Sequence, residues 1–561
     1  MTPFKNILKT GSYLFFLALL YSCAQEKITK AAVVSARAEA SEIGVSIMKK
    51  GGSAFDAMIA TDLALAVCYP NAGNIAGGGF LVFRTASGEL GSLDYREKAP
   101  LLAFDNMYLN QKGDVIPNKS TLGGLAVGVP GTVAGMFAVH QKFGSLPWDE
   151  LVQPSIDLAR NGYKVTLKQA SSFKSKKEDF IAMNGENTFY AQEFTEGSVV
   201  KNEALAKTLE YIAKNGKEGF YKGPVAEALV NRVQETGGII SHEDMQAYKP
   251  VWREPISFKY KNLNIHTMAP PSSGGICLGQ IMKMIESFDV GQYSHNSQKV
   301  VQIIVEAERR SYADRSLYLG DPDFVNIPTD SLLSKKYLMN RMNSFSFKKA
   351  SKSSDILPGS IVWDESEETT HYSIVDQMGN AVAVTTTLNG SYGSKVFVEE
   401  GGYFLNNEMD DFSSKPGVPN MFGLLGGKAN AIEPQKRMLS AMTPTIVERN
   451  GKLAMILGTP GGSTIITSVL QTLLNVYEFK MDIQKAVTAP RFHHQWLPDV
   501  IVFEPNSFNT SLIENLQAKD YKITQEYSRI IGRVDAILIS ESNQISTGAD
   551  PRGDDTAVHL Y

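Results

Sequence analysis

A run of β-branched and apolar residues that starts abruptly after an acidic stretch constrains the fold more than any other feature of this sequence. Residues 365–368 read Glu-Ser-Glu-Glu, and residues 371–376 then have the composition of a buried strand. Residues 377–380, Gln-Met-Gly-Asn, are typical of a turn, and residues 381–388 predict a second strand. The pattern therefore predicts a buried strand–turn–strand unit that follows an irregular, acidic segment.

Two interpretations of Thr369, which stands just before this unit, remain open from the residues alone. A threonine at the head of a strand is most often simply a good strand residue. If the chain is instead cut between Glu368 and Thr369, the new terminus carries a free α-amine beside its own hydroxyl. An N-terminal amine can act as the base that activates such a hydroxyl. The second interpretation depends on motifs elsewhere in the chain.

Four motifs carry a resemblance to a known family. They are Thr-Thr-His-Tyr-Ser at 369–373, Thr-Thr-Thr-Leu-Asn at 385–389, Leu-Asn-Asn-Glu-Met-Asp-Asp-Phe at 405–412, and Thr-Pro-Gly-Gly-Ser at 459–463. In these motifs the sequence resembles the γ-glutamyltransferases (γ-glutamyl transpeptidases), which are N-terminal-nucleophile hydrolases. The resemblance implies an α+β fold, a four-layer αββα sandwich that forms one globular unit from two chains after self-cleavage.

The resemblance also implies the catalytic groups. Thr369 would be the nucleophile that cleavage after Glu368 exposes, and Thr387 would orient its hydroxyl. Gly461 and Gly462 would hold the oxyanion, a task for which free backbone N–H groups at the start of a helix are suited.

A second set of implied residues would bind the substrate. Arg96 would bind an α-carboxylate, because its planar fork makes two charge-assisted hydrogen bonds to one carboxylate. Glu408 and Asp411, assisted by Asn389, would hold the substrate ammonium group. Ser440 would add a hydrogen bond to the carboxylate. From the residues alone, a lone arginine and adjacent acids are more often solvated, so these roles rest on the resemblance.

The sequence departs from the family pattern in two places. Many members have two serines where this chain has Ser440 and Ala441, and losing one neutral hydrogen bond costs about 0.5–1.5 kcal/mol. The glycine-rich segment 415–427 resembles a loop that covers the site in some bacterial members. Phe422 stands there in place of a tyrosine, so a hydroxyl that could bond Asn389 is missing and closure is expected to be looser.

Composition excludes several classes of function. The length of 561 residues alone would suggest three or four domains, but the sequence has no segment rich in Pro, Gly or Ser that would link such domains. A net charge of −4 argues against a nucleic-acid partner. Cys68 and Cys277 are more typical of buried thiols than of a disulfide, and no spacing predicts a metal site. His493 and His494 are interpreted as structural residues.

The N-terminus has the features of an export signal. Lys5 and Lys9 precede a short apolar run at 13–21, which is too short to span a bilayer. The run ends in Leu-Tyr-Ser-Cys, which resembles a lipobox with Cys23 as the lipidated residue. Ordinary cleavage near Ala24 is the alternative.

Together with the family resemblance, which implies the cut after Glu368, these features predict a three-part precursor: a signal peptide at 1–22, a large subunit at 23–368 and a small catalytic subunit at 369–561. The expected location is the periplasm, with the lipid anchor as the only membrane contact. The lack of an aspartate after Cys23 weakly favours the outer membrane.

The sequence also predicts helices and a turn that position the site but are given no catalytic residues. Helices are expected at 35–50, 54–68, 300–319 and 463–477. Asn450-Gly451 predicts a hairpin turn. The charged residues of 300–319 are interpreted as ion pairs on the helix surface and in the core.

Three functions compete. The first is a γ-glutamyltransferase that takes glutathione or other γ-glutamyl compounds and passes the acyl group to water, amino acids or peptides, without cofactor or metal. The second is a related acylase that takes glutaryl or other acyl amides. The third is a non-enzymatic lipoprotein that binds amino acids or peptides, and it alone predicts an uncut chain.

Overall fold

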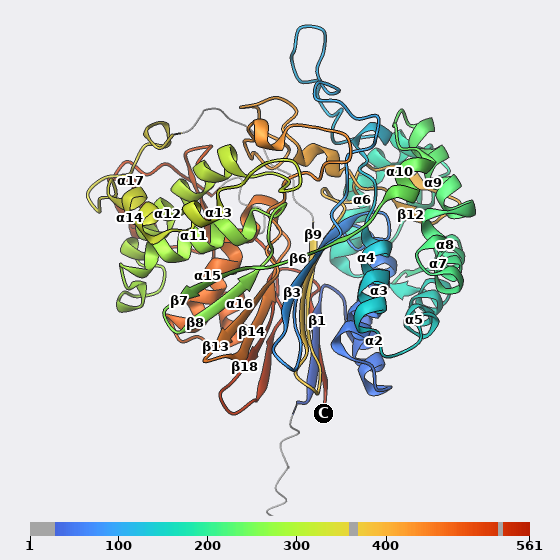
Figure 1. Ribbon diagram of the computed structural model, residues 1–561, viewed down its shortest axis with the longest axis horizontal. Helices are drawn as coiled ribbons and strands as arrows, with labels where there is room; N and C mark the ends of the chain where they lie inside the picture. The colour runs from blue at the N-terminus through green and yellow to red at the C-terminus, as the bar shows by residue number, and fades with distance from the viewer. Residues whose placement is uncertain (1–28, 358–368, 526–530) are drawn as a thin grey trace, which may run out of the picture.

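The computed structural model describes residues 29–357, 369–525 and 531–561, which form two antiparallel sheets packed face to face between helices (Figure 1). The first sheet has seven strands in the order β20 (Thr556–Leu560), β1 (Ala31–Ser35), β9 (Thr369–Val375), β10 (Ala381–Thr387), β2 (Gly78–Arg84), β3 (Leu90–Asp94) and β6 (Val251–Arg253). The second has six in the order β19 (Ile545–Gly548), β18 (Asp535–Ile539), β14 (Lys452–Gly458), β13 (Thr445–Arg449), β8 (Leu263–Thr267) and β7 (Ile256–Tyr260).

Helices cover the outer face of each sheet (Figure 1). Those beside the seven-stranded sheet are α2 (Ala38–Lys49), α3 (Ala54–Cys68), α4 (Thr132–Phe143), α5 (Trp148–Asn161), α6 (Leu167–Asn184), α7 (Glu203–Asn215), α8 (Glu218–Tyr221), α9 (Gly223–Glu235) and α10 (His242–Ala247). Those beside the six-stranded sheet are α11 (Gly274–Glu286), α12 (Gln298–Tyr318), α13 (Thr329–Leu332), α14 (Lys335–Met342), α15 (Ile465–Tyr477), α16 (Ile483–Thr488) and α17 (Thr510–Gln517). The predicted four-layer αββα sandwich is therefore confirmed.

Small ladders complete the described part. They are β4 (Tyr163–Lys164) with β5 (Val199–Val200), β11 (Phe397–Val398) with β12 (Tyr403–Phe404), and β15 (Phe492–His493) with β16 (Ile501–Phe503) and β17 (Ile523–Thr524). Cys68 and Cys277 are buried free thiols, as predicted.

Of four apolar clusters in the described residues, three hold the layers together. The core between the sheets combines Phe80 and Val82 of one sheet with Ile446, Ile456 and Ile537 of the other. The two larger cores lie between each sheet and its helices. Burial of both faces explains why the strands of the central hairpin are rich in Val, Ile and Thr along their whole length.

The predicted central hairpin is confirmed, with shifted ends. β9 begins at Thr369, two residues before the predicted start, and pairs with β1 as well as β10. β10 ends at Thr387 rather than at 388, because Asn389 turns the chain with a φ of 70°. The irregular segment predicted before the hairpin lies largely outside the described residues.

Of three other predictions, two helices begin later than predicted and one hairpin is confirmed. The helix predicted at 35–50 begins only at Ala38, because residues 31–35 form β1, the second strand of the seven-stranded sheet. The hairpin at Asn450-Gly451 is confirmed, with φ values of 54° and 75° between β13 and β14. The helix predicted at 463–477 begins as a 3₁₀ turn at Gly462–Thr464 and becomes α15 at Ile465.

The surface location proposed for some charges of α12 is wrong. Residues 300–315 of this helix are all buried, because α12 runs between α11 and other elements of its layer instead of along the outside. Glu306 pairs with Arg309 and Arg310 inside the protein. A periodic charge pattern does not reveal whether a second layer of structure covers it.

Asp62 gives the fold a pH dependence. This residue of α3 is fully buried, and Tyr372 Oη of β9 donates to its Oδ2 at 2.7 Å. Its Oδ1 has no partner. Burial raises the pKa of the Asp62 carboxyl from 3.8 to about 7. Between these values the folded protein holds a proton that the unfolded chain has lost, so stability falls as pH rises through this window.

We therefore expect Asp62→Asn to become more stable than the parent protein as pH rises. The difference should grow by about 1.4 kcal/mol for each pH unit between pH 5 and pH 7, measured as thermal unfolding midpoints converted to free energies. The exposed acid Asp149, replaced by Asn, serves as the control and should show no such trend. If the free energies of unfolding of Asp62→Asn and the parent protein instead differed by the same amount at every pH in this range, the folded protein would hold this carboxyl ionised.

Candidate active site

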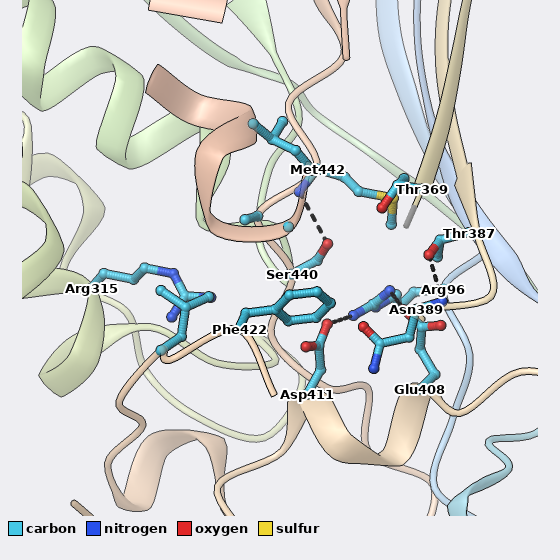
Figure 2. A pocket seen from close by; sticks show the side chains of 14 residues that line it. Arg96, Arg315, Thr369, Thr387, Asn389, Glu408, Asp411, Phe422, Ser440 and Met442 are labelled. Carbon is cyan, nitrogen blue, oxygen red and sulfur yellow. Dashed lines mark hydrogen bonds and ion pairs between the residues drawn. The ribbon is translucent and has the colours of Figure 1, made fainter. Parts of the chain in front are cut away.

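A cavity lies at the ends of β9 and β10, between the two sheets (Figure 2). Its lining residues are Arg96, Arg315, Thr369, Thr387, Asn389, Glu408, Asp411, Phe422, Leu424, Ser440, Ala441, Met442, Gly462 and Ile465. Eight of the nine residues predicted from sequence to do chemistry or bind substrate are among them, and the ninth, Gly461, directly precedes Gly462. Glu368 and Cys23 lie outside the described residues.

Thr369 is held at the rim of the cavity by its place in the sheet. It is the first residue of β9, lies opposite Thr387 in the β9–β10 register, and is 4% exposed. The backbone N–H of Asn389 donates to Thr387 Oγ1 at 2.7 Å. A hydroxyl that accepts one hydrogen bond can still donate another, so the Thr387 hydroxyl remains able to donate a hydrogen bond to Thr369. That Thr387 orients Thr369 stays a prediction.

Asn389 continues β10 into the cavity. Its left-handed backbone, with φ of 70°, suits asparagine better than a β-branched residue. Its Nδ2 donates to the Asn407 carbonyl at 3.0 Å, and Asn407 Oδ1 accepts from the N–H of Gly390 at 2.8 Å. The side chain is therefore fixed against the segment that carries Glu408 and Asp411.

Arg96, Glu408 and Asp411 form an ionic cluster at the floor of the cavity. Arg96 Nη1 contacts Glu408 Oε1, and Arg96 Nη2 contacts Asp411 Oδ2. The acids lie three residues apart in a 3₁₀ turn, Glu408–Asp411, so both face the guanidinium. The interpretation as solvated surface charges is therefore wrong for all three, because each is buried or nearly so.

Glu97 joins this cluster and was not singled out from the sequence. Both of its carboxylate oxygens are buried, Oε2 is 3.8 Å from Arg96 Nη1, and its carboxyl lies at hydrogen-bonding distance from the Glu408 carboxyl. Burial raises the pKa of Glu97 to about 7, and it raises the pKa of Glu408 well above the usual range, although the charge of Arg96 opposes both shifts. Three carboxyls thus share one guanidinium. In the sequence, the only sign of a role for Glu97 in this cluster was its position next to Arg96.

The opposite wall is the turn Ser440-Ala441-Met442. The N–H of Met442 donates to Ser440 Oγ at 3.1 Å. The carbonyl of Ser440 accepts from the N–H of Ser273 at 2.7 Å and from Ser273 Oγ at 2.6 Å. The turn is therefore pinned to the start of α11. Ala441 contributes only a methyl group to the cavity.

Phe422 covers the cavity from the lid segment, residues 415–427. Its ring lies against Gly462, where an added Cβ would come within 2.5 Å of Phe422 Cδ1. Two hydrogen bonds attach residues 420 and 421 of the lid segment to the turn that carries Asp410 and Asp411. Asn420 Nδ2 donates to Asp411 Oδ1 at 2.9 Å, and the N–H of Met421 donates to Asp410 Oδ2 at 2.9 Å.

A contact to Asn389 comes from Met421, not from residue 422. Met421 Sδ lies 3.5 Å from Asn389 Nδ2. A thioether is a weak acceptor, so this contact is a poor substitute for a hydroxyl. The expectation that closure is looser in this chain stays a prediction.

Gly461 and Gly462 place backbone N–H groups at the start of α15. Their φ values are 135° and 50°, which residues with a side chain rarely adopt. An added Cβ on Gly461 would also lie 2.6 Å from Thr464 Oγ1, whose hydroxyl donates to the Gly461 carbonyl at 2.7 Å. Both positions therefore require glycine, and the helix start leaves N–H groups available for a negative oxygen.

The cavity thus combines a hydroxyl, a helix start at Gly462 whose oxyanion role stays a prediction, and a charged floor that offers a guanidinium and carboxyls to a substrate carboxylate and ammonium group. This set suits acyl transfer from a small zwitterionic amide. In the described part of the chain, no group of three or more His, Cys, Asp or Glu side chains has the geometry of a metal site. His493 and His494 lie elsewhere, buried and hydrogen-bonded to Thr467 and Asp499 respectively.

Comparisons with known proteins agree along almost the whole chain. The family described as Gamma-glutamyltranspeptidase matches residues 40–560. The glutathione hydrolase proenzyme of Escherichia coli is 44% identical over 534 residues, which is 94% of this chain and 91% of that protein. The glutathione hydrolase proenzyme of Pseudomonas aeruginosa is 43% identical over 518 residues, which is 91% of each.

Solved structures agree on the fold. The crystal structure of Helicobacter pylori gamma-glutamyltranspeptidase is 42% identical, with a TM-score of 0.57, and the match covers 58% of this chain and 94% of that one. The cephalosporin acylase from Bacillus halodurans is 24% identical, with a TM-score of 0.83 and coverage of 95% and 96%, a likeness of fold alone.

Proposed function

The chain belongs to the gamma-glutamyltranspeptidase family, and on this premise we propose that it is a self-processing γ-glutamyltransferase and glutathione hydrolase with Thr369 as its nucleophile. The observation that carries the proposal is the placement of Thr369. Its side chain stands at the head of β9, in a cavity whose floor holds Arg96, Glu408 and Asp411. A γ-glutamyl group carries its reactive carbonyl at one end and a carboxylate and an ammonium at the other, which matches this arrangement.

The first reaction is cleavage of the precursor. Thr369 Oγ1 attacks the Glu368 carbonyl carbon, the peptide C–N bond breaks, and the acyl group moves to oxygen as an ester. Water then hydrolyses the ester and leaves a free α-amine on Thr369. The products are a large chain of residues 23–368 and a small chain of residues 369–561. The name proenzyme, borne by the similar proteins of E. coli and P. aeruginosa, supports this step.

The second reaction is γ-glutamyl transfer. The Thr369 α-amine, with an ordinary pKa of about 7.7–8.0, takes the hydroxyl proton as Oγ1 attacks the γ-carbonyl of glutathione. Gly461 and Gly462 donate N–H groups to the tetrahedral oxyanion. The leaving amine takes the proton, and the γ-glutamyl ester on Thr369 then passes to water or to the amine of an amino acid or peptide.

Substrate binding exchanges partners in the ionic cluster. The α-carboxylate takes Arg96 and Ser440, while the ammonium takes Glu408, Asp411 and Asn389. Because the arginine and the acids each receive a new partner of opposite charge at the same time, no buried charge is left alone. A ligand with only one of the two groups would leave part of the cluster unpaired.

We expect the purified protein to run as two chains on a denaturing gel, with the smaller beginning Thr-Thr-His. Thr369→Ala should remain a single chain and lose γ-glutamyl anilide turnover by roughly a thousandfold or more. The matched control is Thr370→Ala, because the Thr370 hydroxyl is buried without a partner and its removal should spare cleavage. An active single chain, or full activity in Thr369→Ala, would exclude this mechanism and favour a non-enzymatic binding protein.

A related acylase is the second candidate, because Ala441 removes a hydroxyl from the carboxylate side of the cavity. Glutaryl amides lack the ammonium group, and their carboxylate would take Arg96 and leave Glu408 and Asp411 unpaired. We expect γ-glutamyl anilide to exceed glutaryl anilide in kcat/KM by at least about tenfold. Ala441→Ser should lower KM for γ-glutamyl anilide by up to about tenfold. Faster turnover of the glutaryl compound would identify an acylase instead.

We also propose export and lipid anchoring through Cys23, with outer-membrane placement weakly favoured, on the sequence features of residues 1–25. None of the helices in the described residues is long and apolar enough to cross a bilayer. The parent protein is expected in the detergent phase of a two-phase extraction, and Cys23→Ala in the aqueous phase. Partition of both proteins into the aqueous phase would contradict the anchor.

A further inference from the structure

Arg315 is a buried cation at the cavity that the mechanism above does not use. It stands near the C-terminal end of α12, is 4% exposed, and lines the cavity across from Arg96 (Figure 2). Its Nε donates to Ser273 Oγ at 2.9 Å. Within the described residues no carboxylate lies at ion-pair distance from its guanidinium, whereas Arg96 has three such partners.

Burial raises the pKa of Asp411 and the charge of Arg315 opposes this shift, so that carboxyl is near enough to act on Arg315 but does not pair with it. An arginine buried without an ion pair is costly, and such groups gather at binding sites. The guanidinium keeps its positive charge at all relevant pH values and offers five donors. The hydrogen bond to Ser273 occupies one of them, and Ser273 Oγ in turn donates to the carbonyl of Ser440. The charge of Arg315 is therefore tied to the Ser440-Ala441-Met442 turn, the carboxylate side of the cavity.

The charges around Arg96 show what a second cation would add. Glu97, Glu408 and Asp411 all surround that single guanidinium. A substrate carboxylate that approaches Arg96 therefore also approaches three carboxyls, each of which repels it when ionised. A second positive charge beside Ser440 would offset this repulsion, and Ala441 offers no hydroxyl there that could do so.

We propose that Arg315 determines specificity for donors with an α-carboxylate, by holding the second positive charge that this carboxylate meets on the Ser440 side of the cavity. The inference rests on the proposed γ-glutamyl specificity and adds a residue to it. Arg96 and Arg315 then flank the carboxylate from two sides. The ammonium group is left to Glu408 and Asp411.

Two ligands separate this role from a purely structural one. L-Glutamate carries both charged groups, and 4-aminobutyrate is the same molecule without the α-carboxylate. Their dissociation constants can be measured by calorimetry on the self-cleaved protein without any turnover. Turnover of γ-glutamyl anilide by the parent protein tests the proposed function separately.

We expect Arg315→Gln to weaken L-glutamate binding by about tenfold to a hundredfold and to leave 4-aminobutyrate binding within about threefold. Arg315→Lys keeps the charge and should recover most of the preference for L-glutamate. The matched control is Arg160→Gln, which removes the same charge from a partly exposed arginine on the outer helix α5. The ratio of the two dissociation constants should stay within about threefold of the parent ratio.

Three results would overturn the proposal. One is an equal loss of affinity for both ligands in Arg315→Gln, and another is an Arg160→Gln variant that reproduces the loss of preference. The third is an Arg315→Lys variant no better than Arg315→Gln although it is folded and self-cleaved. If the parent protein turns over γ-glutamyl anilide while any of these results holds, the proposed function stands and only the role of Arg315 fails.

Discussion

The pairing of β9 with β10 is the constraint on which the rest of the structure depends. Thr369 and Thr387 face each other at the end of this ladder, and β9 is flanked on its other side by β1. The β1 ladder pairs only with residues 372–375 of β9, so Thr369 is fixed by its pairing with Thr387 on the β10 side and by burial, and its side chain has little freedom. Preorganisation of this kind lets a hydroxyl act without first paying the entropy of being positioned. The sheets, their cores and the outer helices serve to keep that strand end fixed.

Electrostatics explains the remainder of the site. Arg96, Glu97, Glu408 and Asp411 are buried together, and breaking one of their pairs without a replacement would leave a buried charge alone. A zwitterionic substrate can replace both partners at once, which links binding to the presence of both charged groups. The lid segment takes part, because Asn420 donates to the same Asp411 carboxylate that the ammonium group would use.

Much of the fold and site could be predicted from the sequence, for reasons visible in particular residues. The central hairpin, Asn450-Gly451 and the Gly461-Gly462 pair each carry a local signal, since turn geometry and positive φ restrict the choice of residue. The roles of Arg96, Glu408 and Asp411 needed the family resemblance. β1, Glu97 and Met421 were missed, and Arg315 was interpreted only as part of a helix ion pair, because their partners are distant in sequence. Spacing on a helix cannot distinguish a surface arginine from one that lines a cavity.

The central claim is that one residue, created as a chain terminus, supplies both the attacking oxygen and the proton acceptor. Rapid acid quenching during turnover of a γ-glutamyl anilide, followed by peptide mapping with mass spectrometry, tests it most directly. The account predicts a γ-glutamyl group on the N-terminal peptide of the small chain, attached as an ester to the Thr369 hydroxyl. A γ-glutamyl group on any other residue, or a turning-over enzyme that never carries one, would contradict it.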